Sequence, residues 1–320
     1  MSGIKTVFIV GPTASGKTEL GIKLAKEFNG EIISADSMQI YKNISIASAV
    51  PTVREMCGIK HYLLEFLEPE SDFSVADYVS LARKAVKEIN GMGKLPIVVG
   101  GTGLYINSLA DNIAFTDEPE NSTVRQELSE QFFKVGGEEM LSMLSEIDPD
   151  TAAKLHPSDK KRIIRAFEVY RLTGKTITQQ KEISRTGEKL IEPCLIGITY
   201  RDRQKLYERI NRRVDIMLEK GLEEEAKKAY KRNGGGAFQA IGHKELFGYF
   251  SGECTLEEAV ESLKMQTRRY AKRQLTWFNK DKRIHWIYAD EEENVLAAAE
   301  KTVKEFSEKE DADCERLNRA

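Results

Sequence analysis

The most constraining feature of the sequence is a glycine-rich loop that follows an apolar run near the N-terminus. The apolar residues 6–10 lead directly into residues 11–18, Gly-Pro-Thr-Ala-Ser-Gly-Lys-Thr, which match the pattern G-x-x-x-x-G-K-[ST]. An amphipathic helical pattern follows, with Leu20, Leu24 and Phe28 on one face. In such a unit the backbone N–H groups of the loop face phosphate oxygens, and the helix N-terminus adds partial positive charge. The sequence therefore predicts a P-loop that binds a pyrophosphate-bearing molecule.

Every residue of this loop is a candidate ligand of the pyrophosphate: Gly11, Pro12, Thr13, Ala14, Ser15, Gly16, Lys17 and Thr18. We expect Lys17 to contact the terminal phosphates and the Thr18 hydroxyl to hold Mg²⁺. The same pattern is typical of ATP-binding proteins, but it serves kinases, hydrolases and group transferases alike. The loop alone therefore leaves the phosphate compound open.

A carboxylate lies at the end of the next apolar run. An ordinary P-loop ATPase carries an acidic residue at the end of a second strand, where it holds the metal through water. Here the run 95–99 ends in Gly-Gly-Thr-Gly without a carboxylate, whereas the run 31–35 is followed by Asp36. At the carboxyl edge of a strand beside the P-loop, Asp36 is expected to point into the ligand crevice of an open α/β sheet. It could hold a metal ion or take a proton from an acceptor.

The order of apolar runs indicates an α/β protein, with a P-loop-type parallel sheet flanked by helices and an inserted all-helical domain. Strand patterns at 5–10, 31–35, 95–99, 194–199 and 284–288 alternate with helical patterns. The stretch between the third and fourth runs has no strand pattern and is too long for a loop, so we interpret it as a helical insertion. The expected divisions are a core at 1–114 plus 191–290, an insertion at 115–190, and an acidic C-terminal helix or tail at 291–320.

Bulk composition excludes several classes of protein. The net charge is −3, from 48 Lys and Arg against 51 Asp and Glu, so any basic surface must be local. The cysteines, Cys57, Cys194, Cys254 and Cys314, are scattered without zinc-ligand spacing, which is typical of reduced thiols. No apolar run is long enough to cross a membrane, and the N-terminus leads into a core strand without a signal peptide. We expect a cytoplasmic protein that acts as a monomer without a membrane.

Two segments with helical patterns concentrate positive charge. The first, 158–173, carries Lys160, Lys161, Arg162 and Arg165, and the second, 256–279, carries Lys264, Arg268, Arg269, Lys272 and Arg273. A basic stripe is more often a solvated helix face than a binding site. Two such helices could nevertheless flank an RNA backbone, with each neutralised phosphate adding salt-sensitive affinity.

In combination these motifs resemble the tRNA dimethylallyltransferases, also called tRNA isopentenyltransferases. The resemblance runs from about residue 4 to about residue 288 and is carried by motifs in a consistent order. They are the P-loop at 11–18, Asp-Ser-Met-Gln-Ile-Tyr-Lys at 36–42, Gly-Gly-Thr-Gly-Leu-Tyr at 100–105, Asp-Pro-Asp-Thr-Ala at 148–152, His-Pro at 156–157 with Arg162 and Arg165, Gly-Lys at 174–175, and Tyr-Ala-Lys-Arg-Gln-Leu-Thr-Trp-Phe at 270–278.

The resemblance implies transfer of a dimethylallyl group from dimethylallyl pyrophosphate to N6 of the adenosine immediately 3′ of the tRNA anticodon. Mg²⁺ and the P-loop would stabilise the pyrophosphate leaving group, together with Arg213, which matches a family arginine. Asp36 would accept the N6 proton as general base. Thr13 would lie near the leaving group and Thr102 near the incoming base.

The resemblance also implies a set of contacts with tRNA. Asp36, Ser37, Met38, Gln39 and Thr102 would meet the target adenosine, since Gln is suited to paired contacts with an adenine edge. The wider set is Arg125, Lys161, Arg162 and Arg165 in the insertion, and Gln239, Gly242, His243, Lys244, Lys272, Arg273 and Trp277 elsewhere. At His243 the family more often has tyrosine, which puts a ring-specific contact there in doubt.

Two other functions share parts of this pattern. A P-loop small-molecule kinase would use ATP as donor and would not need the basic helices. An adenylate isopentenyltransferase would share the P-loop and aspartate but would use a free nucleotide as acceptor. The basic insertion and the motif at 270–274 favour the tRNA substrate.

Overall fold

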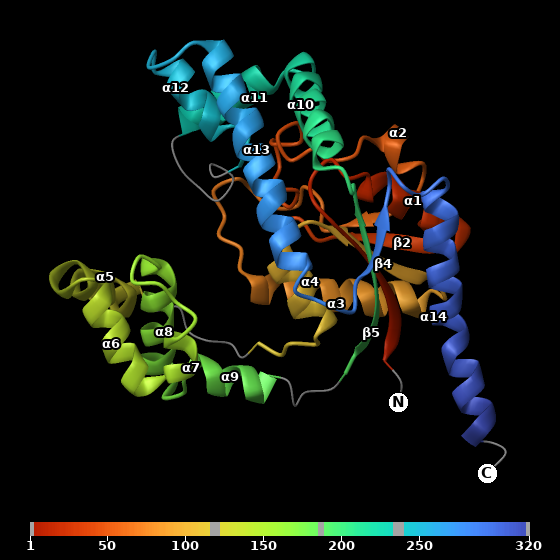
Figure 1. Cartoon of the computed structure of the whole chain (residues 1–320), viewed down its shortest axis with the longest axis horizontal. Helices are drawn as coiled ribbons and strands as arrows, with labels where there is room; N and C mark the ends of the chain where they lie inside the picture. The colour runs from red at the N-terminus through yellow and green to blue at the C-terminus, as the bar shows by residue number, and fades with distance from the viewer. Residues whose placement is uncertain (1–2, 116–121, 185–188, 233–239, 318–320) are drawn as a thin grey trace. The chain divides into compact units, whose positions relative to one another are not determined.

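The computed structural model describes residues 3–115, 122–184, 189–232 and 240–317. The chain forms two compact units: unit 1 comprises Met1–Ala110 and Leu190–Ala320, and unit 2 comprises Asp111–Lys189 (Figure 1). The sequence predicted the insertion at 115–190. Each unit has its own apolar core.

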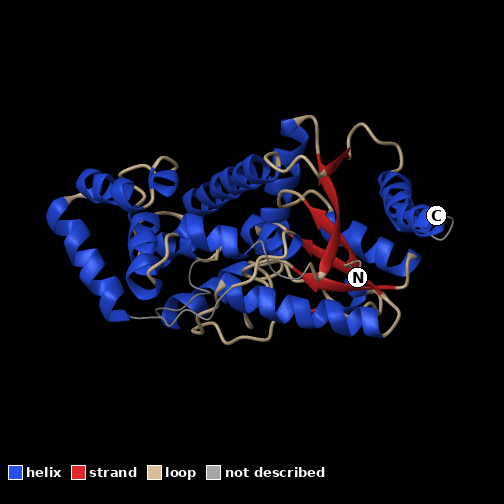
Figure 2. Cartoon of the chain, turned by 90° about the horizontal axis from the view of Figure 1, so that it is seen from below, coloured by secondary structure: helices blue, strands red, loops and turns tan. Residues whose placement is uncertain are grey.

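Unit 1 is built on a six-stranded sheet in the order β3-β2-β4-β1-β5-β6, in which every neighbouring pair is parallel. The strands are drawn in red in Figure 2. The strands are β1 (Ile4–Val10), β2 (Gly30–Ser34), β3 (His61–Tyr62), β4 (Leu95–Gly100), β5 (Ile191–Thr199) and β6 (His285–Tyr288). The α/β fold class and the expected strands are confirmed. Because Val10 at the end of β1 pairs with Gly100 of β4 and Gly197 of β5, the carboxyl ends of the central strands meet at one edge.

Helices cover both faces of this sheet. Alternate residues of β1 divide between two apolar clusters: Phe8 and Val10 face one, and Val7 and Ile9 face the other. The first cluster is completed by α3 (Val75–Gly91) and α4 (Gly103–Ala110). The second is completed by α1 (Lys17–Glu27) and α14 (Val295–Leu317), which lie beside each other in Figure 1. A strand buried on both faces reads as a continuous apolar run, which is why the sequence revealed it.

The acidic C-terminal segment packs on the sheet through its first turns. Ala299 and Val303 of α14 are buried in the second cluster, and Val295 and Phe306 pack against it. This four-residue spacing keeps one face of the helix apolar despite the many acidic residues around it. The first half of α14 is therefore part of the core of unit 1.

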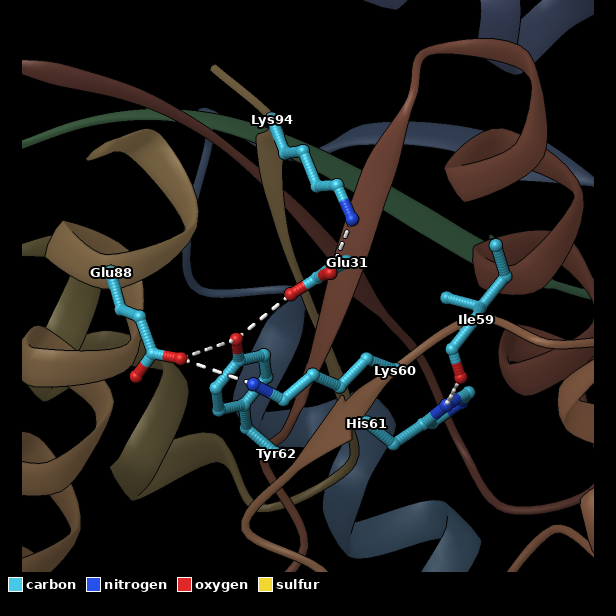
Figure 3. A network of polar contacts seen from close by, with 7 residues as sticks. All are labelled: Glu31, Ile59, Lys60, His61, Tyr62, Glu88 and Lys94. Atoms are coloured by element: carbon cyan, nitrogen blue, oxygen red, sulfur yellow. Dashed lines mark hydrogen bonds and ion pairs between the residues drawn. The ribbon is translucent and has the colours of Figure 1, made fainter. Parts of the chain in front are cut away.

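The short edge strand β3 has no apolar run and was not expected. It is held by a polar network around Tyr62, whose hydroxyl lies 2.8 Å from Glu31 Oε2 and 3.0 Å from Glu88 Oε1 (Figure 3). Lys94 Nζ lies 2.6 Å from the buried Glu31, and Lys60 Nζ lies 3.1 Å from Glu88. Burial, and then the hydrogen bonds to Glu31 and Glu88, raise the pKa of Tyr62 to about 12, although its contact with Lys60 opposes this. The phenol therefore stays protonated, and it fastens β3 to β2 and α3.

A helical layer extends unit 1 beyond the sheet. It comprises α10 (Arg203–Glu219), α11 (Leu222–Arg232), η2 (Lys244–Leu246), α12 (Phe247–Phe250) and α13 (Leu256–Phe278). The short α2 (Val53–Met56) lies between β2 and β3 in the chain. Thr255 begins α13 with a capping box, because its side chain accepts from Glu258 N while Glu258 accepts from Thr255 N. Leu222, Leu246 and Leu263 join residues 40–47 in a separate apolar cluster.

Unit 2 is helical throughout the residues that the structure describes. Its elements are α5 (Ser122–Val135), α6 (Gly137–Ile147), α7 (Pro149–Ala152), α8 (Lys160–Thr173) and α9 (Ile177–Ser184). Leu128, Leu144 and Ile163 meet in its core. The buried Asp148 ties α7 to α9, since its Oδ1 accepts from Thr151 N at 3.1 Å and from Thr178 Oγ1 at 2.6 Å. None of the described helices in the chain is both long and apolar enough to cross a bilayer.

We expect Gly100→Ala to destabilise unit 1, because an added Cβ would overlap the carbonyl group of Ala35 where β2 and β4 converge. The expected loss is about 2 kcal/mol of the free energy of unfolding, typical of overpacking at a closed site. Urea denaturation measures it. Gly91→Ala is the matched control, since nothing lies within 4 Å of its added Cβ, and it should leave stability equal or slightly higher. Equal effects of the two substitutions would contradict this account.

Candidate functional site

The P-loop joins β1 to α1 through glycines that other residues could not replace. Gly11 has a φ of 145° and its added Cβ would overlap the carbonyl oxygen of Ile198, so the loop runs against β5. Gly16, with a φ of 101°, precedes α1 and has no side chain to cap the helix. The N–H groups of the first turn of α1 therefore remain suited to a bound anion.

Two cations lie together beside this loop. Lys17 Nζ donates to the Pro12 carbonyl at 2.6 Å. Burial and then the nearby guanidinium of Arg213 lower the pKa of Lys17 to about 7, and the carboxylate of Asp36 opposes the shift. Burial also lowers the pKa of Arg213, again opposed by Asp36. Two half-buried cations that repel each other favour the binding of a multiply charged anion beside them.

Asp36 lies on the turn that follows β2. Its Oδ1 accepts from Met38 N at 2.9 Å, which fixes the carboxylate on its own turn. Thr102 fastens this turn to the loop after β4, because Ser37 N donates to Thr102 Oγ1 at 3.0 Å and Thr102 N donates to the Ala35 carbonyl at 3.1 Å. Among the described residues, nothing hydrogen-bonds to Oδ2 of Asp36. This oxygen is therefore available to a ligand.

A single pocket in unit 1 brings these groups together. Its polar part is lined by Thr13, Lys17, Thr18, Asp36, Arg213, Tyr270 and Gln274. The rest of the pocket is lined by the apolar residues Ile32, Ala49, Pro51, Leu64 and Val99 and by Ser34, Gln39 and Ser48. His61 also lines this part; burial lowers its pKa, so its ring is neutral at pH 7. The pocket thus combines anion-binding cations, one carboxylate and an apolar wall.

The polar part of the pocket fits a P-loop magnesium site. The Thr18 hydroxyl lines it beside Lys17. The described residues contain no group of three or more His, Cys, Asp or Glu side chains that could hold a metal alone. Mg²⁺ commonly takes one or two protein ligands, with phosphate oxygens and water completing its shell. An ion here would therefore depend on the diphosphate as well as on Thr18.

Gln39, which was predicted to contact the adenine edge, forms hydrogen bonds within the protein instead. Ser34 Oγ donates to Gln39 Oε1 at 2.9 Å, and Gln39 Nε2 lies 3.2 and 3.3 Å from the carbonyl oxygens of Ser48 and Ala49. A paired contact with an adenine edge would require these bonds to break. In this structure Gln39 instead holds the 48–49 wall of the pocket.

His243 cannot contact RNA in this structure, contrary to the expectation from the sequence. Its side chain is 0% exposed, and Nε2 lies 2.9 Å from Glu225 Oε1. The same carboxylate accepts from Ile46 N and Ala47 N, both at 2.9 Å, so the pair supports the loop after Asp36. The adjacent Gly242 is buried too, whereas Lys244 is exposed. Gln239 lies outside the described residues.

The predicted RNA contacts in unit 2 divide into two kinds. Arg125 Nη2 and Arg165 Nη1 lie 3.1 and 2.9 Å from Oε2 of Glu168, a buried carboxylate that they neutralise. Lys161 and Arg162 are exposed on α8. Part of the basic charge of this unit therefore compensates a buried acid, and Lys161 and Arg162 are the better candidates for phosphate contacts.

The basic side of α13 divides in the same way. Lys264 Nζ pairs with Asp215 of α10 at 2.8 Å, whereas Lys272 and Arg273 are exposed. Trp277 is partly exposed and packs on the loop after β4, where an added Cβ on Gly103 would overlap its indole ring. Lys272 and Arg273 thus remain available for RNA, and Trp277 has at least a packing role.

Two polar pocket residues on α13 were not among the site residues predicted from the sequence. Tyr270 and Gln274 lie one turn apart on α13 and both line the pocket. Burial and then the nearby Asp36 raise the pKa of Tyr270, so its phenol stays protonated. The sequence could have pointed to both residues, because they are four positions apart in the motif at 270–278 and this spacing puts both side chains on one helix face.

Comparison with known proteins identifies relatives over most of the chain. The family model for IPP transferases matches residues 39–281. A tRNA dimethylallyltransferase of Thermoanaerobacter sp. (strain X514) is 48% identical over 298 residues, covering 91% of this chain and 94% of the relative. The tRNA dimethylallyltransferase of Bacillus subtilis (strain 168) is 48% identical over 284 residues, covering 88% and 90%.

Solved structures agree with the sequence relatives. A tRNA isopentenylpyrophosphate transferase from Bacillus halodurans is 41% identical with a TM-score of 0.69, over 96% of this chain and 99% of that one. A eukaryotic dimethylallyltransferase described as acting on tRNA is 29% identical with a TM-score of 0.80, over 94% and 78%. The likeness therefore extends to both sequence and fold.

The pKa of Lys17 predicts proton uptake when an anion binds. At about pH 8 most Lys17 side chains of the free protein are neutral, and a bound diphosphate raises their pKa, so binding should take up about one proton. At about pH 6 this uptake should be small, because Lys17 is already charged. Calorimetric titration with inorganic pyrophosphate and Mg²⁺ in buffers of different ionisation enthalpy measures it. Lys17→Arg is the control, since its guanidinium is always charged; equal uptake by both proteins would assign the proton elsewhere.

Proposed function

Because this chain belongs to the tRNA dimethylallyltransferase family, we propose that it transfers a dimethylallyl group from dimethylallyl pyrophosphate to N6 of the adenosine 3′-adjacent to the anticodon of tRNA. The observation that carries this proposal is that Lys17, Arg213 and Asp36 share one pocket. In the reaction the N6–carbon bond forms, the allylic C–O bond breaks, pyrophosphate leaves and the N6 proton passes to Asp36.

Stabilisation of the leaving group is the first requirement of this reaction. Negative charge accumulates on pyrophosphate as the C–O bond breaks, and preorganised donors lower the barrier most in a site shielded from water. Lys17, Arg213 and the first turn of α1 are such donors, and Thr13 lies beside them. Mg²⁺ bound at Thr18 would add positive charge at the diphosphate oxygens.

Activation of the acceptor is the second requirement. The N6 amine is a weak nucleophile because its lone pair is delocalised into the purine ring, so removal of its proton helps the bond to form. Asp36 is suited to this role because Met38 N fixes one carboxylate oxygen and leaves Oδ2 open to the pocket. Thr102 supports the same turn through Ser37.

Delivery of the base requires a surface for the RNA. The target adenosine must leave its stack to reach a carboxylate inside a pocket, as in other enzymes that modify bases. We propose that Lys272 and Arg273 of unit 1, and Lys161 and Arg162 of unit 2, contact the phosphates, because all four are exposed. Since the substrate is tRNA, we also propose that the protein acts in the cytoplasm.

One assay distinguishes this function from its alternatives. The protein is incubated with labelled dimethylallyl pyrophosphate, Mg²⁺ and either bulk tRNA or AMP, and the labelled product is digested to identify the modified nucleoside. Label in N6-dimethylallyladenosine at the position after the anticodon supports the proposal. Label in AMP alone would indicate an adenylate isopentenyltransferase. Phosphate transfer from ATP without prenylation would indicate a kinase.

We expect Asp36→Asn to lower the turnover number at least about 100-fold, because the amide keeps the size of the side chain but cannot accept the N6 proton. The affinity for dimethylallyl pyrophosphate should change much less. Single-turnover transfer and calorimetric donor binding measure the two effects. Glu27→Gln on the exposed surface is the control for loss of one negative charge. Lost donor affinity with unchanged turnover at saturation would assign Asp36 to the donor or its metal ion instead.

We expect the double substitution Lys272→Ala with Arg273→Ala to weaken tRNA binding and to make its dependence on salt shallower, by about one unit of log–log slope for each lost phosphate contact. Filter binding over a range of salt concentrations measures the slope. Lys301→Ala with Lys304→Ala on the exposed side of α14 removes the same charge elsewhere. If the two double variants gave the same slope, α13 would not lie in the RNA interface.

A further inference from the structure

We propose that Gln274 is a positioning residue that fixes the donor-binding loop and the acceptor-binding loop relative to each other. The inference rests on the proposed function, since it assigns the two loops to donor and acceptor. Gln274 lies on α13, and its side chain is 6% exposed. It reaches two loops that follow different strands of the sheet, β1 and β4.

The side-chain amide forms one hydrogen bond at each end. Thr13 N donates to Gln274 Oε1 at 2.8 Å, and Gln274 Nε2 donates to the Gly101 carbonyl at 3.0 Å. One bond needs an acceptor and the other needs a donor, so the side chain must carry both. A carboxylate could not donate to Gly101, and an apolar side chain would leave the buried Gly101 carbonyl and the partly buried Thr13 N–H without this partner.

The packing around the amide leaves little freedom. A Cβ added to Gly101 would overlap Gln274 Nε2, so the loop after β4 lies directly against the helix. Tyr270, one turn earlier on α13, lies beside both Thr102 and Gln274. The same face of α13 therefore meets the loop after β4 at two successive residues, 101 and 102.

The two hydrogen bonds of Gln274 form a bridge between the loops, and each end of this bridge is adjacent to a group that the reaction needs. Thr13 belongs to the P-loop, whose Lys17 contacts the Pro12 carbonyl. Gly101 precedes Thr102, whose hydroxyl accepts from the N–H of Ser37, the neighbour of Asp36. Since the reacting carbon and N6 must approach to about 3–3.5 Å, a small change in the spacing of the two loops would slow transfer. Gln274 acts through these loops and transfers no proton itself.

The fold does not depend on this amide to keep α13 in place. Ala271 and Phe278, on the same helix, are completely buried, and Leu263 anchors the helix in another apolar cluster. Loss of the bridge should therefore change the alignment of the loops more than it changes the packing of the helix.

Gln274→Met tests the proposal, because it keeps the length and approximate volume of the side chain while removing both hydrogen bonds. We expect the turnover number for transfer to tRNA to fall roughly 10- to 100-fold, as for a misaligned reactive pair. The dissociation constant for dimethylallyl pyrophosphate should stay within about threefold, because the groups that bind phosphate remain. Gln266→Met on the same helix is the matched control: Gln266 does not line the pocket, and its transfer rate should equal that of the unaltered protein.

Gly101→Ala disturbs the same contact, because its added Cβ would overlap Gln274 Nε2. This variant tests the proposal if Gln274→Met does not fold. It should also slow transfer, and the two losses should not multiply in the double variant, because both remove one bridge. A turnover number within twofold of normal in Gln274→Met, or fully multiplicative losses, would overturn the positioning role. Absence of transfer by the unaltered protein would instead overturn the proposed function, and this inference with it.

Discussion

The pocket of unit 1 depends above all on the charges that surround the ammonium group of Lys17. The ammonium group is partly withdrawn from solvent next to a second cation, Arg213, and Asp36 only partly compensates for both, so burial and this repulsion lower the pKa of Lys17 to about 7. A multiply charged anion would relieve this repulsion and restore the charge of Lys17, so the pocket is suited to the diphosphate of the proposed donor. The carboxylate that compensates the cations is also the group proposed to accept the proton. Binding and chemistry therefore share one small set of charges.

The backbone around the pocket is arranged to bring these charges close together. Gly11 lies against the carbonyl of Ile198, and Gly100 lies against that of Ala35, so the ends of the strands approach as closely as main chain allows. A side chain at Gly11 would push the P-loop away from β5, and one at Gly100 would push the end of β4 away from the turn that carries Asp36. Gln274 then links the P-loop to the loop after β4 through its amide. Rigid strand ends and one bridging side chain together set the geometry of the site.

Basic residues that look equivalent in the sequence have different tasks in the structure. Arg125 and Arg165 both pair with the buried Glu168, and Lys264 pairs with Asp215, so each of these cations has an acidic partner within the protein. Lys272 and Arg273 are exposed and can serve the RNA. The predicted RNA contacts at 242–244 also differ from one another, since His243 is buried against Glu225 whereas Lys244 is exposed. The sequence motifs alone did not show which of these residues are paired within the protein and which are exposed.

The sequence by itself determined the strands, the P-loop and Asp36, because each is recorded in consecutive residues as an apolar run or a fixed spacing. It could not reveal β3, which is held by Tyr62, Glu31 and Glu88 rather than by an apolar pattern. Nor could it show that Gln274 reaches Thr13 across 261 residues of chain, or that His243 lies inside the core. Only the tertiary structure decided these contacts, because pairing between distant polar groups leaves no periodic signal in the chain.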